Sequence, residues 1–213
     1  MKFTKDDLLL YAVTDRAWVG EKSLFEQVEE ALQGGVTMVQ LREKTMDEEA
    51  FLNEAIQMKQ LCHKYQVPLI INDNVEVALK SGADGVHVGI EDAPVSEIRK
   101  RVGKEFIIGA TAKTVEQAQK AEAAGADYLG VGAVFASDTK KTAVRITKEQ
   151  LREICTSVSI PSVAIGGITL ENVTQIDSDC ICGVAVVSAI FGANDIKSAT
   201  MELKNKVKTM IYQ

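Results

Sequence analysis

The chain has 213 residues, which is enough for one well-buried domain and short for two. Its net charge of −6 argues against a general nucleic-acid binder, and no apolar run reaches the about 18 residues that a membrane-spanning helix needs. The polar start, without an apolar stretch behind it, shows no secretory leader, so we expect a cytoplasmic protein that does not bind membranes.

The cysteines and histidines argue against two further classes of protein, zinc-binding proteins and enzymes with a Ser-His-Asp triad. No Cys-x-x-Cys pair occurs, and only His63 and His87 are available as partners, so the sequence gives little support to a zinc site. Two histidines also make a Ser-His-Asp type of enzyme improbable. We expect four free thiols, at Cys62, Cys155, Cys180 and Cys182.

Short apolar runs alternate with helical patterns along the whole chain. The predicted strands are Leu8–Thr14, Met38–Leu41, Leu69–Ile71, Gly85–Val88, Phe106–Ala110, Tyr128–Val131, Ser162–Ile165 and Gly183–Val187. The predicted helices are Leu24–Gln33, Asp47–Tyr65, Val75–Lys80, Ser96–Arg101, Val115–Ala124, Lys148–Thr156, Glu171–Ile176 and Ile196–Met210.

A repeated helix-to-strand junction supports this arrangement of eight βα units. Gly35, Gly82 and Gly125 each close a helix just before a β-run, and they lie 47 (82−35) and 43 (125−82) residues apart. Glycine adopts the left-handed conformation of such a tight turn at little cost. The pattern predicts a single (β/α)8 barrel over residues 1–213, with its active site at the C-terminal ends of the strands.

Acidic side chains follow the third and fourth predicted strands. Asn72-Asp73 and Asp92 would lie on adjacent parts of the barrel rim, and one or two carboxylates are what Mg²⁺ usually takes from a protein. Alternatively, Asp73 caps the helix near Val75, and Asp92 begins the turn before Pro94.

Cationic and small residues follow other strands. Arg42 and Lys44 alternate with Glu43, so both can face one side and bind phosphate, unless they form a solvated charge pair. The segment Ser137-Asp138-Thr139-Lys140-Lys141 is either an anion clamp or a solvated loop. Gly166-Gly167 and Val187-Ser188 predict a phosphate site after strands seven and eight, although either one alone could be a simple tight turn.

Three further side chains carry an aromatic or imidazole ring. We expect His87 to be a hydrogen-bonded core residue rather than a general base. Tyr11 and Trp18 either line the pocket or only pack against neighbours; the sequence leaves both open.

Taken in order, these clusters resemble thiamine phosphate synthases along almost the whole chain. The matching segments are Tyr11–Asp15, Gln40–Lys44, Ile71–Asp73, Gly82–Gly89, Gly125–Gly132, Thr139–Lys141, Ile165–Ile168 and Val187–Ile190. The family joins a hydroxymethylpyrimidine diphosphate to a thiazole phosphate, releasing pyrophosphate.

The resemblance implies a transferase in thiamine biosynthesis, Mg²⁺ as cofactor and small phosphorylated substrates as partners; a homo-oligomer is possible. Asp73 and Asp92 would hold the metal, with Arg42, Thr111 and Lys140 as catalytic residues. The implied substrate-binding residues are Gln40, Arg42, Lys44, Asn72, Thr111, Ser137, Thr139, Lys140, Gly167, Val187 and Ser188.

The chain departs from the family at several positions. The family commonly has Gln in place of Ile90, Ser in place of Thr111 and often His in place of Lys113, while Asp138 replaces a hydroxyl residue. Two alternatives follow: a barrel enzyme like thiazole tautomerase, which works by acid–base chemistry, or a non-catalytic barrel that binds a phosphorylated ligand.

Overall fold

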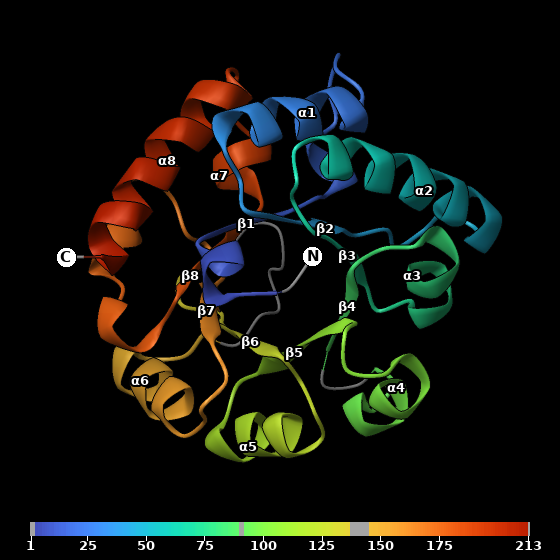
Figure 1. The fold of residues 1–213 in the computed structure, drawn as a ribbon. Coiled ribbons are helices and arrows are strands. Elements are labelled where there is room, and N and C mark those ends of the chain that lie inside the picture. The colour runs from blue at the N-terminus through green and yellow to red at the C-terminus, as the bar shows by residue number, and fades with distance from the viewer. Residues whose placement is uncertain (1–2, 90–91, 137–144, 213) are drawn as a thin grey trace.

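The computed structural model describes residues 3–89, 92–136 and 145–212. Eight parallel strands close into a barrel in chain order, with β1 pairing both β2 and β8, and the longer helices surround it (Figure 1). This confirms the predicted (β/α)8 barrel. The strands are β1 Leu10–Val13, β2 Met38–Leu41, β3 Leu69–Asn72, β4 Gly85–Val88, β5 Ile107–Ala112, β6 Tyr128–Gly132, β7 Ser162–Ile165 and β8 Gly183–Val186.

The helices agree with the predicted ones to within a few residues, except that the helix predicted after β7 is not formed and the short helix α7 after β8 was not predicted. They are α1 Leu24–Gly34, α2 Glu48–Lys64, α3 Val75–Ser81, α4 Val95–Val102, α5 Val115–Ala123, α6 Lys148–Thr156, α7 Ser188–Phe191 and α8 Ile196–Ile211, with 3-10 turns η1 Lys5–Leu8, η2 Arg16–Trp18, η3 Val173–Gln175 and η4 Ser178–Cys180.

Two predicted boundaries are wrong for local reasons. The helix predicted over Glu171–Ile176 is only the 3-10 turn η3, whose N-cap residue Asn172 makes no capping hydrogen bond. Instead Asn172 donates to the carbonyl of Gly167 and accepts from the N–H of Thr169, so it braces the turn after β7. The first strand starts at Leu10 rather than Leu8, because η1 occupies Lys5–Leu8 at the N-terminal end of the barrel (Figure 1).

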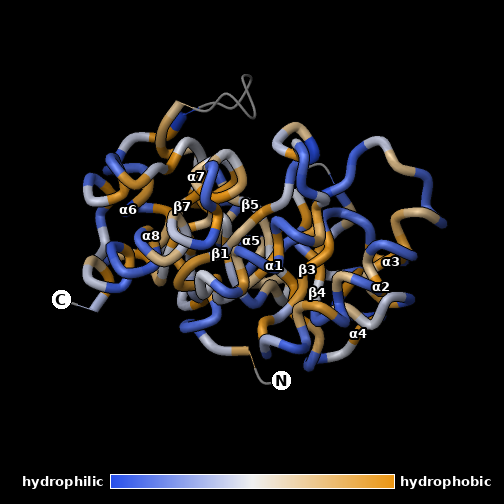
Figure 2. The backbone as a smooth tube through the Cα atoms, turned by 90° about the horizontal axis from the view of Figure 1, so that it is seen from above, coloured by the Kyte–Doolittle hydropathy of each residue, from blue (hydrophilic) through white to orange (hydrophobic). Residues whose placement is uncertain are grey.

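Successive residues of each strand pack alternately into two hydrophobic cores, one between the barrel and the helices and one inside the barrel. Residues such as Leu10 and Val39 pack outward against the helices, whereas Tyr11, Met38 and Tyr128 fill the interior of the barrel. Figure 2 shows hydrophobic residues concentrated along the central strands. This period of two places polar inward-facing residues at the C-terminal ends of strands in one pocket.

The repeated junction has a hydrogen-bonding role. The residue just before β2, β4 and β6 accepts a hydrogen bond from a backbone N–H in the preceding strand: Thr37 from Leu10, Asp84 from Leu69, and Asp127 from Ile108. The preceding glycines have positive φ, as predicted for Gly35, Gly82 and Gly125. β2, β4 and β6 are therefore each registered on the preceding strand by a side chain.

Replacing Asp84 with Ala is expected to destabilise the fold by about 2–3 kcal/mol, because it leaves both the Leu69 N–H and the Lys59 ammonium without their partner. Asp84→Asn, which can still accept from Leu69, should lose about half as much. Urea unfolding of both variants measures the difference. Equal losses would show that the Lys59 ion pair, rather than strand registration, matters at this junction.

One further prediction concerns the cysteines. All four cysteines are free, as predicted. Within the described residues, no helix combines the length and apolar character required to span a membrane.

Candidate active site

A cavity of about 340 Å³ opens at the C-terminal ends of the strands. It brings together every predicted site residue that the structure describes: Gln40, Arg42, Lys44, Asn72, Asp73, Asp92, Thr111, Gly167, Val187 and Ser188. Lys113 and Tyr11 line it as well, which resolves the open place of Tyr11. The predicted Ser137, Thr139 and Lys140, together with the departures Ile90 and Asp138, lie outside the described residues.

Two carboxylates face each other across the ends of β3 and β4. Burial, followed by the neighbouring Asp73 carboxylate, raises the pKa of Asp92. Asp73 also accepts hydrogen bonds from the Lys44 ammonium (2.5 Å) and the Asn72 amide (3.1 Å). A cation held between the two acids would remove their repulsion, so this donor set fits Mg²⁺.

Of the two alternative roles considered for these acids, helix capping by Asp73 is not observed, whereas Asp92 does form part of a turn. Asn74, not Asp73, caps α3 by accepting from the N–H of Val77, and Asp73 has a positive φ of 61°. The capping role suggested for Asp73 is therefore wrong, and a strained aspartate at a strand end is more typical of a functional position. Asp92 accepts from the N–H of Gly89, so it does take part in the turn after β4.

The two metal candidates form a pair rather than a larger cluster. Among residues 3–89, 92–136 and 145–212, no group of three or more His, Cys, Asp and Glu side chains could hold a metal. Asp73 and Asp92 are the two residues that would hold a Mg²⁺ ion at this site.

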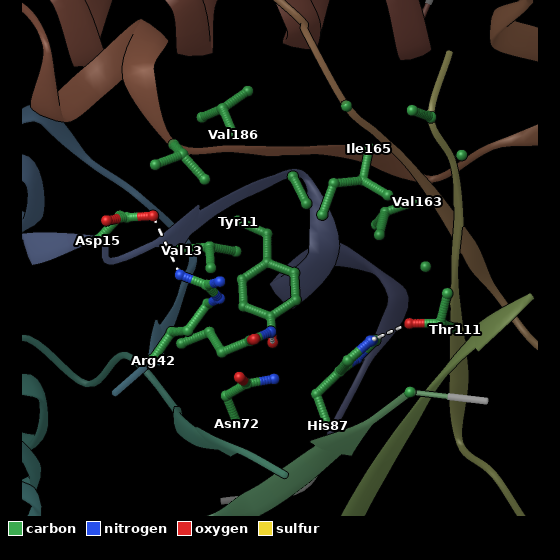
Figure 3. A pocket seen from close by; sticks show the side chains of 18 of the residues that line it. Tyr11, Val13, Asp15, Arg42, Asn72, His87, Thr111, Val163, Ile165 and Val186 are labelled. Carbon is green, nitrogen blue, oxygen red and sulfur yellow. Dashed lines mark hydrogen bonds and ion pairs between the residues drawn. The ribbon is translucent and has the colours of Figure 1, made fainter. Parts of the chain in front are cut away.

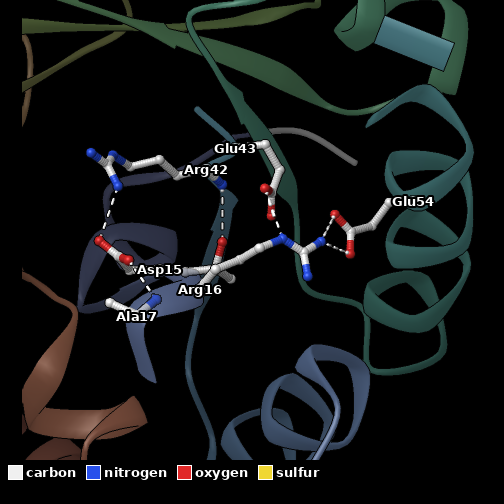
Figure 4. A network of polar contacts seen from close by, with 7 residues as sticks. Asp15, Arg16, Ala17, Arg42, Glu43 and Glu54 are labelled. Carbon is white, nitrogen blue, oxygen red and sulfur yellow. Dashed lines mark hydrogen bonds and ion pairs between the residues drawn. The ribbon is translucent and has the colours of Figure 1, made fainter. Parts of the chain in front are cut away.

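The predicted alternation after β2 is confirmed (Figure 4). Arg42 lines the pocket and donates to Asp15 (3.0 Å), whereas Glu43 faces the other way and accepts from Arg16, which also binds Glu54. Burial raises the pKa of Glu43, and Arg16 partly offsets this. Arg16 therefore braces the outer side of the loop while Arg42 stays on the pocket side.

Small residues make the opposite wall. Gly166 and Gly167 both have positive φ, and a Cβ on Gly167 would overlap the backbone of Ala136. Val187 precedes α7, whose first residue is Ser188. These segments line the same cavity, as the predicted phosphate site after strands seven and eight requires.

The floor of the pocket is a chain of polar side chains inside the barrel. The Gln40 amide donates to the Tyr11 hydroxyl, which is 2.8 Å from the Tyr128 hydroxyl. His87 lies between Tyr128 and Thr111, with ring nitrogens 3.0 and 3.1 Å from their hydroxyls. Figure 3 shows the contact between His87 and Thr111. His87 is thus a hydrogen-bonded core residue, as predicted.

Burial lowers the pKa of His87 to about 4, with a small opposing effect from Asp92. Between pH 6.5 and 4 the unfolded chain therefore binds more protons at this site than the folded one, so stability falls as the pH is lowered through this window. We expect this to amount to about 3 kcal/mol. Comparing urea unfolding of the wild type and His87→Gln at both pH values measures it, with the exposed His63→Gln as control; parallel curves for wild type and His87→Gln would contradict it.

Two residues of the site were not predicted from the sequence. Tyr128 is buried at the centre of the floor, and Asp15 orients Arg42. Both lie in segments that carried the family resemblance, but neither residue type indicates such a role without its spatial partner. Trp18 is 36% exposed and contributes no surface to the cavity described above.

Comparison with known proteins agrees with this geometry. The family model described as thiamine monophosphate synthase matches residues 10–190. The thiamine-phosphate synthase of Ruminiclostridium cellulolyticum is 49% identical, covering 94% of this chain and 95% of that protein. That of Methanobrevibacter smithii is 46% identical, covering 95% and 96%.

Solved structures give the same result at the level of the fold. A thiamine phosphate pyrophosphorylase from Pyrococcus furiosus superposes with a TM-score of 0.89 at 40% identity, covering 97% of this chain and 98% of that one. A 3-hexulose-6-phosphate synthase, 15% identical with a TM-score of 0.69, shares the fold alone. With a family model matched over most of its length and near-full-length relatives above 40% identity, the chain belongs to the thiamine monophosphate synthase family.

Proposed function

We propose that this protein is a Mg²⁺-dependent thiamine phosphate synthase, a transferase that joins a hydroxymethylpyrimidine diphosphate to a thiazole phosphate and releases pyrophosphate. The observation that carries the proposal is that cationic residues, a carboxylate pair and a glycine-lined wall converge on one cavity. Membership of the family supports the choice of substrates.

The diphosphate is assigned to the side of the pocket formed by β2, β3 and β4. Gln40, Arg42, Lys44 and Asn72 supply amide, guanidinium and ammonium donors there, and Asp73 and Asp92 would hold Mg²⁺. The bound metal would neutralise negative charge on the diphosphate oxygens. The buried Asn72 Oδ1 has no partner among the described residues, so it is available to accept from a substrate donor.

The second substrate is assigned to the opposite wall. Backbone N–H groups near Gly167, Val187 and Ser188 suit a phosphate. Family resemblance adds Ser137, Thr139 and Lys140, with the lysine on the leaving pyrophosphate, and Thr111 at the pyrimidine. Cytoplasmic location and a homo-oligomeric state stay predictions from the sequence.

The proposed chemistry needs no protein nucleophile. As the carbon–oxygen bond to pyrophosphate breaks, negative charge grows on the leaving group, and fixed cations such as Arg42 and Lys44 stabilise it. The thiazole nitrogen then attacks the carbon cation, which works only if the two substrates are held in contact. This agrees with a pocket floor whose histidine is neutral at physiological pH.

Formation of thiamine phosphate by the purified protein, with Mg²⁺ and with a chelator, tests the proposal. Metal-dependent turnover supports it, and no product from folded protein with verified substrates overturns it. A non-catalytic binding barrel would then bind thiazole phosphate without turnover, whereas a tautomerase would isomerise a thiazole in the absence of the pyrimidine.

Lys140→Ala tests whether Lys140 stabilises the leaving pyrophosphate during the reaction or only helps to bind the substrate. Its single-turnover rate at saturating substrates should fall on the order of 10²-fold, because the residue is assigned to the charge developing on the leaving group. The matched control is Lys120→Ala, an exposed lysine paired with Glu116 on α5. An unchanged rate in Lys140→Ala would remove this assignment.

A further inference from the structure

Five polar side chains form one unbroken hydrogen-bonded chain across the barrel interior. It runs from Gln40 on β2 through Tyr11 on β1, Tyr128 on β6 and His87 on β4 to Thr111 on β5, with heavy-atom distances of 2.7, 2.8, 3.0 and 3.1 Å. Both ends line the pocket, whereas Tyr128 is fully buried and Tyr11 is 1% exposed. We call it the Gln40–Thr111 chain.

With the Gln40 amide placed so that Nε2 faces Tyr11, the number of hydrogens sets the direction of the remaining bonds in this chain. Gln40 Nε2 donates to Tyr11, so the single hydroxyl hydrogen of Tyr11 is directed to Tyr128. Tyr128, already accepting, directs its own hydrogen to Nδ1 of His87. A proton on Nδ1 would leave that hydroxyl hydrogen without an acceptor.

In this arrangement His87 is a neutral imidazole with its hydrogen on Nε2. That hydrogen is donated to the Thr111 hydroxyl, which leaves the hydroxyl hydrogen of Thr111 to be donated elsewhere. Because Thr111 lines the cavity, this hydrogen is available to a bound ligand.

Gly109 and Gly130 leave the space that the side chains of the Gln40–Thr111 chain occupy. A Cβ on Gly109 would overlap the ring of Tyr128 and His87 Nδ1, and one on Gly130 would come within 3.2 Å of the imidazole. The surrounding strands are therefore built so that the imidazole and the phenol can meet.

We propose that the Gln40–Thr111 chain is a proton-ordered relay in which the amide of Gln40 sets the tautomer of His87 and thereby makes Thr111 a hydrogen-bond donor to the substrate. Tyr11, Tyr128 and His87 are positioning residues in this scheme. Since hydroxyl hydrogens rotate freely, Thr111 alone could equally accept, and a substrate with the wrong polarity would fit just as well.

This inference deepens the proposed function and rests on it for the identity of the ligand. The pyrimidine atom that faces Thr111 is then an acceptor, such as a ring nitrogen, and not an N–H or C–H group. An analogue with C–H in place of that ring nitrogen leaves the Thr111 hydroxyl unpaired in the pocket, which weakens binding.

The tautomer of His87 can be read directly by ¹⁵N NMR of histidine-labelled protein, without any substrate. Only two histidines are present, and His63→Gln identifies the signals of His87. We expect the hydrogen on Nε2 and an unprotonated Nδ1. A hydrogen on Nδ1 would reverse every bond of the chain and overturn the proposal.

Gln40→Glu tests whether the far end controls the tautomer. An ionised carboxylate can only accept, so Tyr11 would donate to it, Tyr128 to Tyr11, and His87 Nδ1 to Tyr128. The hydrogen of His87 should move from Nε2 to Nδ1 as the introduced carboxylate, followed by its ¹³C signal, ionises. An ionised carboxylate with no change at His87 would overturn the relay.

Two controls separate the relay from a general effect of charge. Asn72→Asp makes the same amide-to-carboxylate change beside His87 but outside the chain, and it should leave the hydrogen on Nε2 (Figure 3). In Gln40→Glu combined with Tyr128→Phe the broken chain should no longer transmit the change. A tautomer switch in either control would overturn the proposal.

The kinetic consequence is tested separately. If the protein turns over, Tyr128→Phe should raise KM for the pyrimidine substrate about 5-fold with little change in kcat, because ligand orientation rather than charge stabilisation is affected. An unchanged KM would overturn the link to substrate polarity. Absence of turnover in the wild type would refute the proposed function while leaving the NMR result valid.

Discussion

Asp92→Asn is expected to lower turnover at saturating Mg²⁺ on the order of 10³-fold and to remove most of the response to added metal. The variant keeps the shape of the side chain and can still accept from the N–H of Gly89, so the turn after β4 should survive. It removes one of the two negative charges that would hold the cation, and a metal ion on a leaving diphosphate typically contributes several kcal/mol. Steady-state rates over a Mg²⁺ titration measure the effect.

Without metal, Asp92→Asn should make the folded protein slightly more stable than the wild type. The pKa of Asp92 is raised in the folded protein, so its ionised form disfavours folding once the pH exceeds that pKa. At pH 7 to 8 in chelator, Asp92→Asn should therefore melt slightly higher than the wild type, whereas added Mg²⁺ should stabilise only the wild type.

Glu97→Gln is the matched control, because it replaces an exposed carboxylate by an amide on α4, the helix that follows Asp92. It should change neither the rate nor the Mg²⁺ response. Mg²⁺-dependent turnover of Asp92→Asn near the wild-type level would exclude the metal role of this residue.

The arrangement of strand ends was predictable because it follows from local pattern. Alternation after β2 sends Arg42 and Glu43 to opposite sides in any extended chain, and the glycine junctions at Gly35, Gly82 and Gly125 mark where strands begin. In a parallel barrel all C-terminal ends lie at one rim. Residues identified one strand at a time therefore come together in one cavity.

The floor of the pocket could not be predicted in this way. The contact between Tyr11 and Tyr128 joins residues 117 positions apart, and it depends on the register of the strands between them. Nothing in the local sequence of Tyr128 distinguishes it from an apolar barrel residue. The failed helix after β7 has a similar cause, since Asn172 makes its hydrogen bonds to Thr169 and Gly167 instead of capping.

Arg42→Lys is expected to reduce kcat/KM on the order of 10²-fold although the charge is kept. In the structure one nitrogen of the guanidinium, Nη1, donates to Asp15, which leaves the other N–H groups of the planar fork for phosphate oxygens. A lysine has a single ammonium and cannot hold Asp15 and a phosphate in the same geometry. Asp15→Asn keeps the arginine and weakens only its orientation, so the loss should be nearer 5-fold.

The ranking of these two variants is what identifies the role of Arg42. Kinetics at fixed, saturating thiazole phosphate and varied pyrimidine diphosphate would measure it, with Arg101→Lys as control, since Arg101 forms an exposed ion pair with Glu76. If charge alone mattered, Arg42→Lys would stay within about 2-fold of the wild type, and the fork would have no part in binding the diphosphate. If Asp15→Asn were the more damaged variant, the Asp15 carboxylate itself would have to contact the substrate or its metal, and Arg42 would serve to position it.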